Sequence, residues 1–379
     1  MSDLIVVAGE ASGDRAAAAV VRHLEGARAW GLGGAACASA GVELIDDMRQ
    51  WTALGVGEAA LRGTRILQAW RALSRATRSR RPRAALLVNY SEFNARLAPQ
   101  LHALGVRVLW YGAPQVWAWR PRRIESLRTS IDRMAVMLPF EEALWRAGGV
   151  DAHYVGHPAL ETVALDRQAA RSALAMTSMA AAVAVLPGSR PHEVRRLLVP
   201  MLDAYEAVRT DRASVDARVL VASSLDASTR TWLQGVCEAR HVATFDVDAR
   251  TGAGAVLRAF DVALCASGTA SLEAALARAV PIVAYRVGLA TELTARALVR
   301  TKHFALPNVL LGRRAFPELL QREATASGIG EALAGALDGR AELVAACNEV
   351  EAKLQGASHP SPLVARMLAP WLGASARAA

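Results

Sequence analysis

Lysine is almost absent from this 379-residue chain: it occurs only at Lys302 and Lys353, so arginine carries nearly all of the positive charge. Lysine and arginine together number 44 against 35 acidic residues, which gives a formal net charge of +9. An excess of positive charge attracts anions such as nucleotides, phosphorylated substrates and acidic lipid surfaces.

Cysteine is also scarce, and the four cysteines are far apart, without a Cys-x-x-Cys pair. This argues against a disulfide framework and a zinc site, and it fits a reducing cytoplasm. No uninterrupted apolar run reaches 18 residues, and the apolar start of the chain is too short for a signal peptide. We therefore expect a cytoplasmic chain whose membrane contact, if any, is peripheral.

Three nucleotide and hydrolase signatures are missing as well. There is no Walker A sequence, no Gly-x-Gly-x-x-Gly fingerprint and no Gly-x-Ser-x-Gly elbow. These absences argue against an NTPase, a nicotinamide enzyme and a serine hydrolase. No loop carries a convincing Asp-x-Asp pair, so we expect neither a metal nor a cofactor.

What the chain does have is an alternation of short apolar runs and longer segments of helical period, which is typical of parallel sheets with crossover helices. Its length predicts two domains. Each half is expected to form a Rossmann-like, doubly wound α/β domain. The expected strands are Leu4–Ala8, Ala29–Gly31, Ala85–Asn89, Val106–Tyr111, Arg133–Leu138, Ala152–Val155, Ala182–Leu186, Ala217–Val221, Ala243–Asp246, Val262–Ala266 and Pro281–Tyr285. The expected helices include Asp14–Glu25, Phe140–Ala147, Glu193–Thr210, Ala270–Arg278 and Thr291–Val299.

The domain boundary is expected within Pro158–Ala170, where one set of strand signals ends and another begins. We predict an acceptor- and membrane-facing domain over residues 1–165, a nucleotide-sugar domain over 166–345 and a helical tail over 346–379. The tail is expected to pack back on the first domain.

The first candidate nucleotide loop is Leu186-Pro187-Gly188-Ser189-Arg190, between a predicted strand and a predicted helix. Gly188 and Ser189 are expected to leave backbone N–H groups free at the helix entrance, where the helix dipole favours a negative charge. Arg190 can add a bidentate contact to a phosphate. The alternative is a plain strand–helix turn with a solvated arginine.

The second candidate loop is Ala266-Ser267-Gly268-Thr269-Ala270-Ser271-Leu272-Glu273, which again joins a strand to a helix. Its small residues allow a pyrophosphate close to the backbone, and the hydroxyls of Ser267 and Thr269 can donate hydrogen bonds. The Glu273 carboxylate can accept both hydroxyls of a ribose, although a carboxylate early in a helix also stabilises the helix. Both loops follow strands of one domain, where open α/β sheets bind ligands.

Several short sequences then point to one family by their order along the chain. They are Gly9-Glu10-Ala11-Ser12-Gly13-Asp14, Ala113-Pro114-Gln115-Val116-Trp117-Ala118-Trp119-Arg120, Leu138-Pro139-Phe140-Glu141, Gly156-His157-Pro158, the two loops above and Leu306-Pro307-Asn308. This ordered set, which covers nearly the whole chain, resembles the lipid-A-disaccharide synthases.

The resemblance implies a GT-B glycosyltransferase with two Rossmann-like domains facing a cleft. It implies a hexosyltransferase of lipid A biosynthesis that joins UDP-2,3-diacylglucosamine to 2,3-diacylglucosamine 1-phosphate through a β-1,6 bond, with inversion and release of UDP. It implies that Asn308 is a donor-site residue; without the match, Asn308 is a turn asparagine. We expect Gly9, Ser12, Gly13, Asn94 and Trp117 on the sugar or acceptor side; the alternatives are ordinary helix capping for Ser12 and a place in the core for Trp117.

At one position the chain departs from the family pattern Asp-x-x-Asp-Phe-Asn, because it has Asn89-Tyr90-Ser91-Glu92-Phe93-Asn94. An amide cannot take the proton of the acceptor hydroxyl, so Asn89 cannot be the general base. Three alternatives follow: Glu92 has taken the role with Asn89 orienting it or the sugar, Glu10 is the base, or the chain binds its ligands and catalyses poorly. A catalytically impaired UDP-sugar or lipid-binding paralogue therefore stays open, as does another GT-B UDP-N-acetylglucosamine transferase or epimerase.

Finally, acidic residues are absent between Glu58 and Glu92, a stretch that contains eight arginines with apolar residues between them at helical spacing. A basic amphipathic helix with a tryptophan suits an anionic membrane surface. The residues that we expect there are Arg62, Arg65, Trp70, Arg71 and Arg75. The alternative is a surface helix whose apolar stripe packs on the sheet. Because no nucleic-acid module is recognisable, we expect no nucleic-acid partner and a peripheral location on the inner face of the cytoplasmic membrane. The sequence makes no prediction of the oligomeric state.

Overall fold

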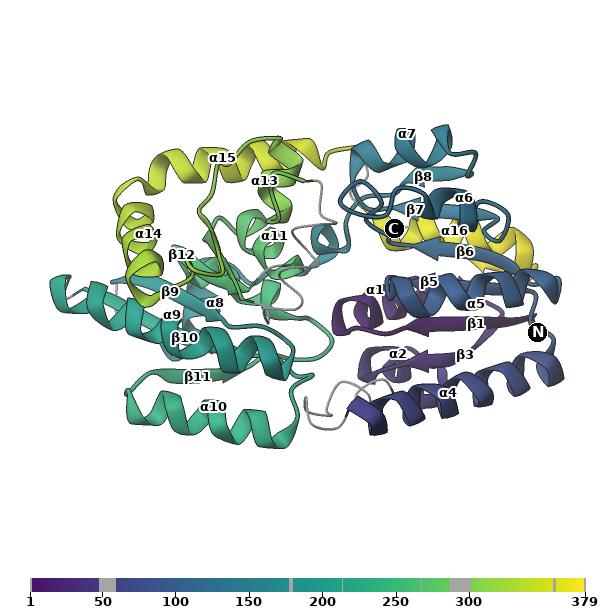
Figure 1. Cartoon of the computed structure of the whole chain (residues 1–379), viewed down its shortest axis with the longest axis horizontal. Coiled ribbons are helices and arrows are strands. Elements are labelled where there is room, and N and C mark those ends of the chain that lie inside the picture. Colours follow the sequence, from purple (N-terminus) through teal and green to yellow (C-terminus); the bar gives the residue numbers. More distant parts are fainter. Residues whose placement is uncertain are drawn as a thin grey trace. The chain divides into compact units, whose positions relative to one another are not determined.

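The computed structural model describes residues 2–47, 59–176, 180–212, 214–266, 268–286, 301–356 and 359–377, with only the backbone of residues 2 and 59–62. The chain divides into two compact units, one formed by Met1–Glu161 with Leu354–Ala379 and the other by Thr162–Lys353. Each unit is built on its own parallel sheet (Figure 1). This confirms the prediction of two Rossmann-like α/β domains.

The first unit has a seven-stranded parallel sheet. In spatial order its strands are β4 (Glu43–Asp47), β3 (Ala27–Gly33), β1 (Ser2–Ala8), β5 (Ala84–Val88), β6 (Arg107–Tyr111), β7 (Arg133–Val136) and β8 (Ala152–Tyr154). Its helices are α1 (Ala11–Arg22), α2 (Ala35–Ser39), α4 (Ala59–Arg80), α5 (Ser91–Ala103), α6 (Arg123–Leu127), α7 (Pro139–Ala147), the 3₁₀ helix η2 (Pro158–Glu161) and α16 (Pro360–Leu372).

Successive residues of a strand point to opposite faces of the sheet, and in the central strands both sets are apolar. Helices therefore cover both faces of this sheet. Leu4 and Val6 of β1 belong to a core cluster with α1, α2 and α16, whereas Ile5 and Val7 belong to a cluster with α4, α5 and α7. Such strands read as continuous apolar runs, and this is why the sequence predicts them well.

The last helix of the chain completes the core of the first unit. In Figure 1, α16 lies in yellow among the blue strands of that unit. Val364 and Leu368 are fully buried in the cluster that also holds α1, and Arg133 donates a hydrogen bond to the carbonyl of Met367 at 3.0 Å. After α16, the strand β15 (Ser375–Ala376) pairs antiparallel with β2 (Leu24–Glu25) of the same unit.

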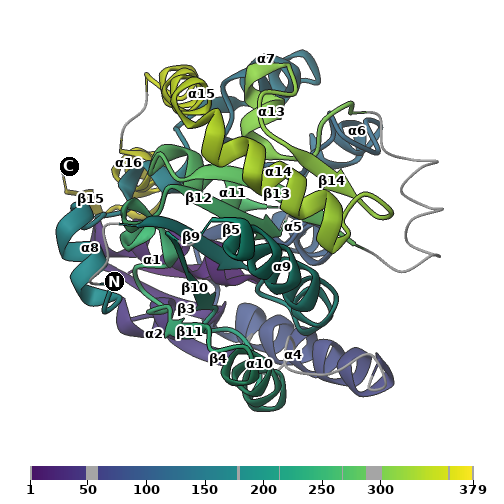
Figure 2. The same ribbon diagram turned by 90° about the vertical axis from the view of Figure 1, so that its left-hand side faces the viewer.

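The second unit has a six-stranded parallel sheet. In spatial order its strands are β11 (Ala243–Asp246), β10 (Val215–Val221), β9 (Ala181–Leu186), β12 (Val262–Ala266), β13 (Val280–Tyr285) and β14 (Glu318–Leu320). Its helices are α8 (Arg167–Ala173), α9 (Pro191–Asp211), α10 (Ala227–Ala239), η3 (Ala253–Ala255), η4 (Leu257–Ala259), α11 (Thr269–Leu276), α13 (Leu306–Leu311), α14 (Ala326–Asp338) and α15 (Arg340–Lys353). Helices α9 and α14 pack side by side, as Figure 2 shows, and α8, η4 and α11 share a core cluster with alternate residues of β9 and β12.

Each sheet has one point at which the strand order reverses. In the first sheet the chain runs from β1 to β3 on one side and returns to β5 on the other, and in the second it runs from β9 to β10 and returns to β12. In open α/β sheets, ligands bind at such a switch point, beyond the carboxyl ends of the two diverging strands. The loops after β1 and β5, and those after β9 and β12, are therefore the places to look for a site.

Some expected elements differ from those observed. The strands β4 and β14 at the sheet edges had no clear sequence signal, α1 begins at Ala11 rather than Asp14, and the strand expected to reach Leu138 ends at Val136. The helix expected at Thr291–Val299 lies outside the described residues. No helix in the described part of the chain combines the length and the apolar character needed to span a bilayer.

Candidate active site

The two loops at the switch point of the first sheet are packed against each other. Gly9, directly after β1, lies against the ring of Tyr90, and a Cβ on Gly9 would come within 2.2 Å of the Tyr90 ring. A substitution at Gly9 would therefore push Tyr90, and the loop that carries it, out of place. Gly9 and Gly13 are buried and Glu10 and Ser12 are half-buried, so these residues line the start of α1.

Asn89 is the first residue after β5, and its side chain lies between Gly13 of α1 and Gly112, which follows β6. A Cβ on Gly112 would lie 2.1 Å from Asn89 Oδ1, and one on Gly13 would lie 3.6 Å from Asn89 Nδ2. The backbone of Asn89 and Tyr90 is left-handed, with φ of 49° and 45°. Two consecutive non-glycine residues in this region are strained, and such strain concentrates at functional sites. The structure thus places Asn89 beside the first turn of α1, within the switch point.

Asn94 and Asp14 hold these loops in place. The fully buried Asn94 donates from Nδ2 to the carbonyl of Asn89 at 2.9 Å, which fixes the strained turn. Asp14 accepts hydrogen bonds from the backbone N–H groups of Gly34, Ala36 and Cys37 at 2.7–3.1 Å. Asp14 therefore caps α2, and Asn94 stabilises the turn that carries Asn89.

Glu92 lies on the first turn of α5 with its side chain 54% exposed. Its Oε1 accepts hydrogen bonds from Arg120 at 3.0 Å and from Arg123 at 2.8 Å. The guanidinium of Arg120 also stacks 4.5 Å from the centre of the Trp119 ring. One carboxylate and two arginines therefore form a small charged group beside the switch point, and it carries a surplus of positive charge.

Trp117 and Glu141 form a hydrogen-bonded pair beyond the carboxyl ends of β6 and β7. The half-buried Trp117 donates from Nε1 to Glu141 Oε1 at 2.9 Å, and its ring meets that of the exposed Phe140 edge to face, with centres 5.4 Å apart. Glu141 Oε2 accepts the N–H of Leu138 at 3.1 Å. Burial raises the pKa of Glu141 to about 7, although the hydrogen bond from Trp117 opposes the rise.

In the second unit, the loop after β9 corrects one expectation. The backbone N–H groups of Ser189 and Arg190 are not free, because both donate to Glu193 Oε2, at 3.2 and 3.3 Å. Gly188 has φ of +127°, and a Cβ there would lie 2.6 Å from the Glu193 side chain, so glycine is required. Arg190 has a 45% exposed side chain and lies 3.4 Å from Glu193 Oε1. The carboxylate of Glu193 thus lies where a bound anion would accept the N–H groups of this loop.

The loop after β12 leads into α11 through Gly268, whose φ of +124° favours glycine. Thr269 begins the helix and is half-buried, and Glu273 is buried one turn further on. Ser267 lies outside the described residues. Because β9 and β12 are neighbouring strands, their two loops leave the same edge of the sheet at its switch point.

Asn308 does not present its side chain to a ligand in this structure. It is fully buried in α13, its Nδ2 donates to the carbonyl of Phe316, and its Oδ1 accepts the N–H groups of Ala315 and Phe316, all at 2.9 Å. Its amide therefore holds the turn that follows α13. Nearby, Glu318 Oε1 accepts the N–H groups of Phe304 and Ala305 and fixes the start of the same segment.

The arginine-rich segment forms α4, a surface helix. Arg65, Arg71 and Arg75 are exposed, whereas the side chain of Arg62 lies outside the described residues. Trp70 is partly buried in the core and meets Phe93 edge to face at 5.1 Å. The helix therefore faces the core with its apolar stripe and presents arginines on its other side, so Trp70 is not an exposed membrane anchor.

Sequence reasoning gave no role to Glu141 or Glu193, although both hold candidate loops. A sequence signal was present, because each glutamate is the third residue of its helix and each helix begins with proline. The two sequences are Leu138-Pro139-Phe140-Glu141 and Arg190-Pro191-His192-Glu193, each starting at the N-cap. Glutamate at this position turns back to the N-cap backbone. Among the described residues, no group of three or more His, Cys, Asp or Glu side chains is arranged to hold a metal ion.

Comparison with known proteins shows which family the chain resembles and which solved structures share its fold. A family model described as lipid-A-disaccharide synthetase matches residues 4–362. The lipid-A-disaccharide synthase of Myxococcus xanthus is 41% identical over 334 residues, which is 86% of each chain. Among solved structures, a putative UDP-N-acetylglucosamine 2-epimerase from Listeria monocytogenes superposes with a TM-score of 0.68 at 10% identity over 97% of this chain and 96% of that one. The spinosyn rhamnosyltransferase SpnG superposes with a TM-score of 0.60 at 15% identity over 97% and 100%.

Proposed function

Since this chain belongs to the lipid-A-disaccharide synthase family and is a glycosyltransferase, we propose that it joins UDP-2,3-diacylglucosamine to 2,3-diacylglucosamine 1-phosphate with inversion and releases UDP. The observation that carries the proposal is the position of the family's short sequences: those at residues 9–14, 186–190 and 266–273 fall at the switch points of the two sheets, and three more follow the carboxyl ends of β6, β7 and β8. The chemistry requires an in-line attack by the acceptor 6-hydroxyl, a base for its proton and a partner for the departing pyrophosphate.

The second unit supplies the donor side of this proposal. Arg190, the N–H groups of Ser189 and Arg190, and the start of α11 at Gly268 and Thr269 converge on one edge of the sheet. Cations and helix N-termini can neutralise a pyrophosphate, so the proposed reaction uses neither a metal nor a cofactor. Glu193 has to release the two N–H groups as the pyrophosphate enters. Glu273 is proposed to accept the ribose hydroxyls.

The first unit supplies the acceptor side. Arg120, with a side chain 48% exposed, is close to Glu92 and can bind the 1-phosphate of the acceptor. The exposed Phe140 and the half-buried Trp117 form an apolar surface that suits an acyl chain. Gly9, Ser12 and Gly13 follow β1, the neighbour of β5, and Gly13 faces the side chain of Asn89.

We propose Glu92 as the general base, with Asn89 as a positioning residue, and keep Glu10 as the second candidate. The hydrogen bonds from Arg120 and Arg123 both go to Glu92 Oε1, and no described residue bonds to Oε2. Oε2 is therefore the oxygen that can accept the proton of the acceptor hydroxyl. Asn89 lies next to the first turn of α1, where its amide can donate to a sugar oxygen.

Asn89 also motivates a second candidate function, in which the chain binds a UDP-sugar or lipid and catalyses poorly. UDP release measured with both acylated substrates separates the two. We expect activity in the wild type, a loss of 10²-fold or more in Glu92→Gln, and no loss in Glu125→Gln, an exposed glutamate of the same unit. Full activity in Glu92→Gln contradicts the assignment of the base.

The variant Asn89→Asp completes this experiment. It places a carboxylate beside the N-terminal turn of α1, where the helix dipole favours a negative charge. If the wild type is inactive and Asn89→Asp is active, the chain is the impaired binder. Release of UDP from UDP-N-acetylglucosamine without the acylated acceptor supports instead a different GT-B transferase or an epimerase.

We further propose that the chain works at the inner face of the cytoplasmic membrane. The exposed arginines of α4 suit an anionic lipid surface, to which each contributes about 1 kcal/mol near the headgroups. Substrates with acyl chains make such a location useful, because they are themselves held in the membrane.

A further inference from the structure

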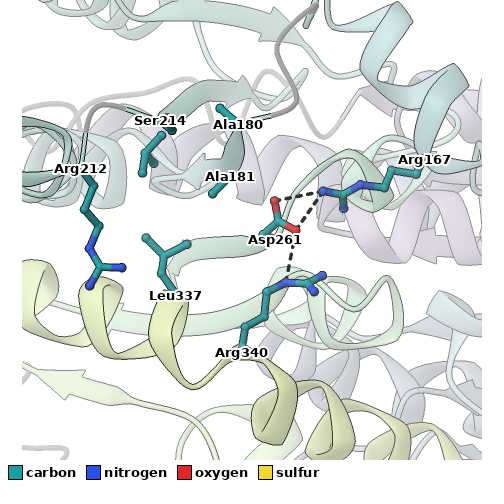
Figure 3. A pocket seen from close by; sticks show the side chains of 9 residues that line it. Arg167, Ala180, Ala181, Arg212, Ser214, Asp261, Leu337 and Arg340 are labelled. Carbon is teal, nitrogen blue, oxygen red and sulfur yellow. Dashed lines mark hydrogen bonds and ion pairs between the residues drawn. The ribbon is translucent and has the colours of Figure 1, made fainter.

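The amino-terminal edge of the second sheet, opposite the proposed nucleotide loops, carries a cluster of arginines around a cavity. Figure 3 shows this cavity, which has a volume of about 420 Å³. Its wall includes Ala181 at the start of β9, Ser214 and Val215 at the start of β10, and Asp261 just before β12. All of these residues belong to the second unit.

Asp261 is the only carboxylate in the lining of this cavity, and three guanidinium groups surround it. Its side chain is 12% exposed and pairs with Arg167 at 2.9 Å, Arg340 at 3.2 Å and Arg171 at 3.7 Å. The same carboxylate accepts the N–H of Ala182 at 2.9 Å, so it also fixes the start of β9. One negative charge cannot neutralise three positive ones, and the surplus remains in the wall of the cavity.

A second cavity of about 420 Å³ adjoins the first, because Arg167 and Arg340 line both. The remaining lining residues of the second cavity are Arg258, Phe260, Ala277, Arg278 and Glu351. Four arginines therefore face a single carboxylate there. Glu351 already pairs with Arg278, so it does not offset the charge of the other three.

Two of these arginines have donors to spare. Arg258, on η4, is exposed, and its guanidinium makes no ion pair or hydrogen bond with any residue that the structure describes. Arg340 meets Asp261 through Nε, and its two terminal nitrogens have no described partner. A planar guanidinium fork with free N–H groups is the side chain best suited to bind a phosphate through two hydrogen bonds.

We propose that Arg167, Arg258, Arg278 and Arg340 form a second anion site, which binds a phosphate group. The site lies at the starts of strands whose far ends carry the proposed nucleotide loops, so the length of β9 separates the two by roughly 20 Å. It is thus distinct from the donor site. A volume of this size accommodates a small phosphorylated molecule or the phosphate headgroup of a lipid.

The test is calorimetric titration of pyrophosphate into the full chain with saturating UDP, which blocks the proposed donor site. We expect Arg258→Gln to weaken pyrophosphate binding about tenfold, because one charge-assisted contact is lost. Arg258→Gln/Arg340→Gln should weaken it further. Arg250→Gln is the matched control: it removes the same charge from an exposed loop after β11 and should leave binding unchanged.

The guanidinium of Arg258 has no partner among the described residues, so Arg258→Gln is not expected to unfold the chain, and a thermal melt verifies this. Equal pyrophosphate affinity in the wild type and in folded Arg258→Gln overturns the proposal. So does an equal loss in Arg250→Gln, which indicates attraction by net charge alone. Arg190→Gln, titrated without UDP, reports on the donor site separately, so a failure of the proposed function is recognisable from its own result.

A second arm identifies the source of the phosphate, with vesicles of phosphatidylglycerol as the probe. If the ligand is a lipid headgroup, Arg258→Gln reduces sedimentation with the vesicles and the vesicles compete with pyrophosphate. If it is a soluble phosphorylated molecule, vesicle binding is the same in wild type and Arg258→Gln while pyrophosphate binding differs. Either result supports the anion site and decides between its two sources.

Discussion

Trp117 donates its indole N–H to the buried carboxylate of Glu141 at 2.9 Å, across two of the short sequences that identify the family. Glu141 is 3% exposed, and burial raises its pKa from 4.5 to about 7. The folded chain therefore holds this proton more tightly than the unfolded chain does. The carboxyl favours the folded state below pH 4.5, and this contribution is lost as pH rises to about 7.

We accordingly predict that Glu141→Gln changes the pH dependence of stability. With 1.36 kcal/mol for each pKa unit, the wild type loses on the order of 3 kcal/mol from this group between pH 4.5 and 7, and the variant does not. Glutamine also sets an N–H against that of Leu138, which costs about 1–3 kcal/mol at every pH. Urea unfolding at pH 5, 6, 7 and 8 measures the difference; a constant difference between the two proteins contradicts the assignment.

Glu193 gives a prediction for nucleotide binding. Because its carboxylate holds the N–H groups of Ser189 and Arg190, an incoming pyrophosphate has to displace it. Glu193→Gln keeps the helix cap and removes the repulsion, so the Kd for UDP should fall about tenfold. Titration with UDP measures this, and Glu206→Gln on the same helix serves as the control. Weaker binding in Glu193→Gln indicates that the carboxylate contacts the nucleotide instead.

Arg120 gives a prediction for the acceptor. Arg120→Gln should raise KM for 2,3-diacylglucosamine 1-phosphate about tenfold or more, because a charge-assisted hydrogen bond to the phosphate is lost. An acceptor without the 1-phosphate should show no such difference between the two proteins. Arg122→Gln removes an equal charge two residues away and should behave like the wild type. A parallel loss with both acceptors places Arg120 elsewhere than at the phosphate.

The exposed arginines of α4 give a prediction for membranes. Arg71→Gln/Arg75→Gln should weaken binding to anionic vesicles by about 2 kcal/mol, roughly 30-fold, while activity on detergent-dispersed substrate is retained. Trp70→Ala should instead destabilise the fold, since the indole packs on Phe93 in the core. Its signal should therefore fall in the vesicle assay and in the detergent assay alike. Equal losses of the arginine variant in vesicles and detergent would count against a membrane role.

The sequence predicts the central strands well but misses the edge strands β4 and β14, for a physical reason. Strands such as β1 and β9 are apolar on both faces, so each reads as an unbroken run. The edge strand β4 is half-buried, with the sequence Glu-Leu-Ile-Asp-Asp, and β14 has three residues. Neither offers an apolar pattern long enough to distinguish it from a loop.

The candidate site divides in a similar way. The glycine-rich loops are predictable because strand, small residues and helix are adjacent in the sequence. The contacts of Asp14 with the start of α2 and of Asn308 with Phe316 depend on folded positions, and no local pattern announces them. The capping glutamates Glu141 and Glu193 lie between these cases, because their spacing is local but their effect on the loops is visible only in three dimensions.

The position of α16 in the first unit has a consequence for the order in which the chain is made. Domains generally fold as units, the N-terminal one first during synthesis. Here the first unit to leave the ribosome lacks Val364, Leu368 and their neighbours, which are made after the second unit. Its sheet has to wait with part of one apolar face uncovered while the whole second unit is synthesised. Truncation before residue 360 should therefore leave the late-made unit intact and the early-made one prone to aggregation.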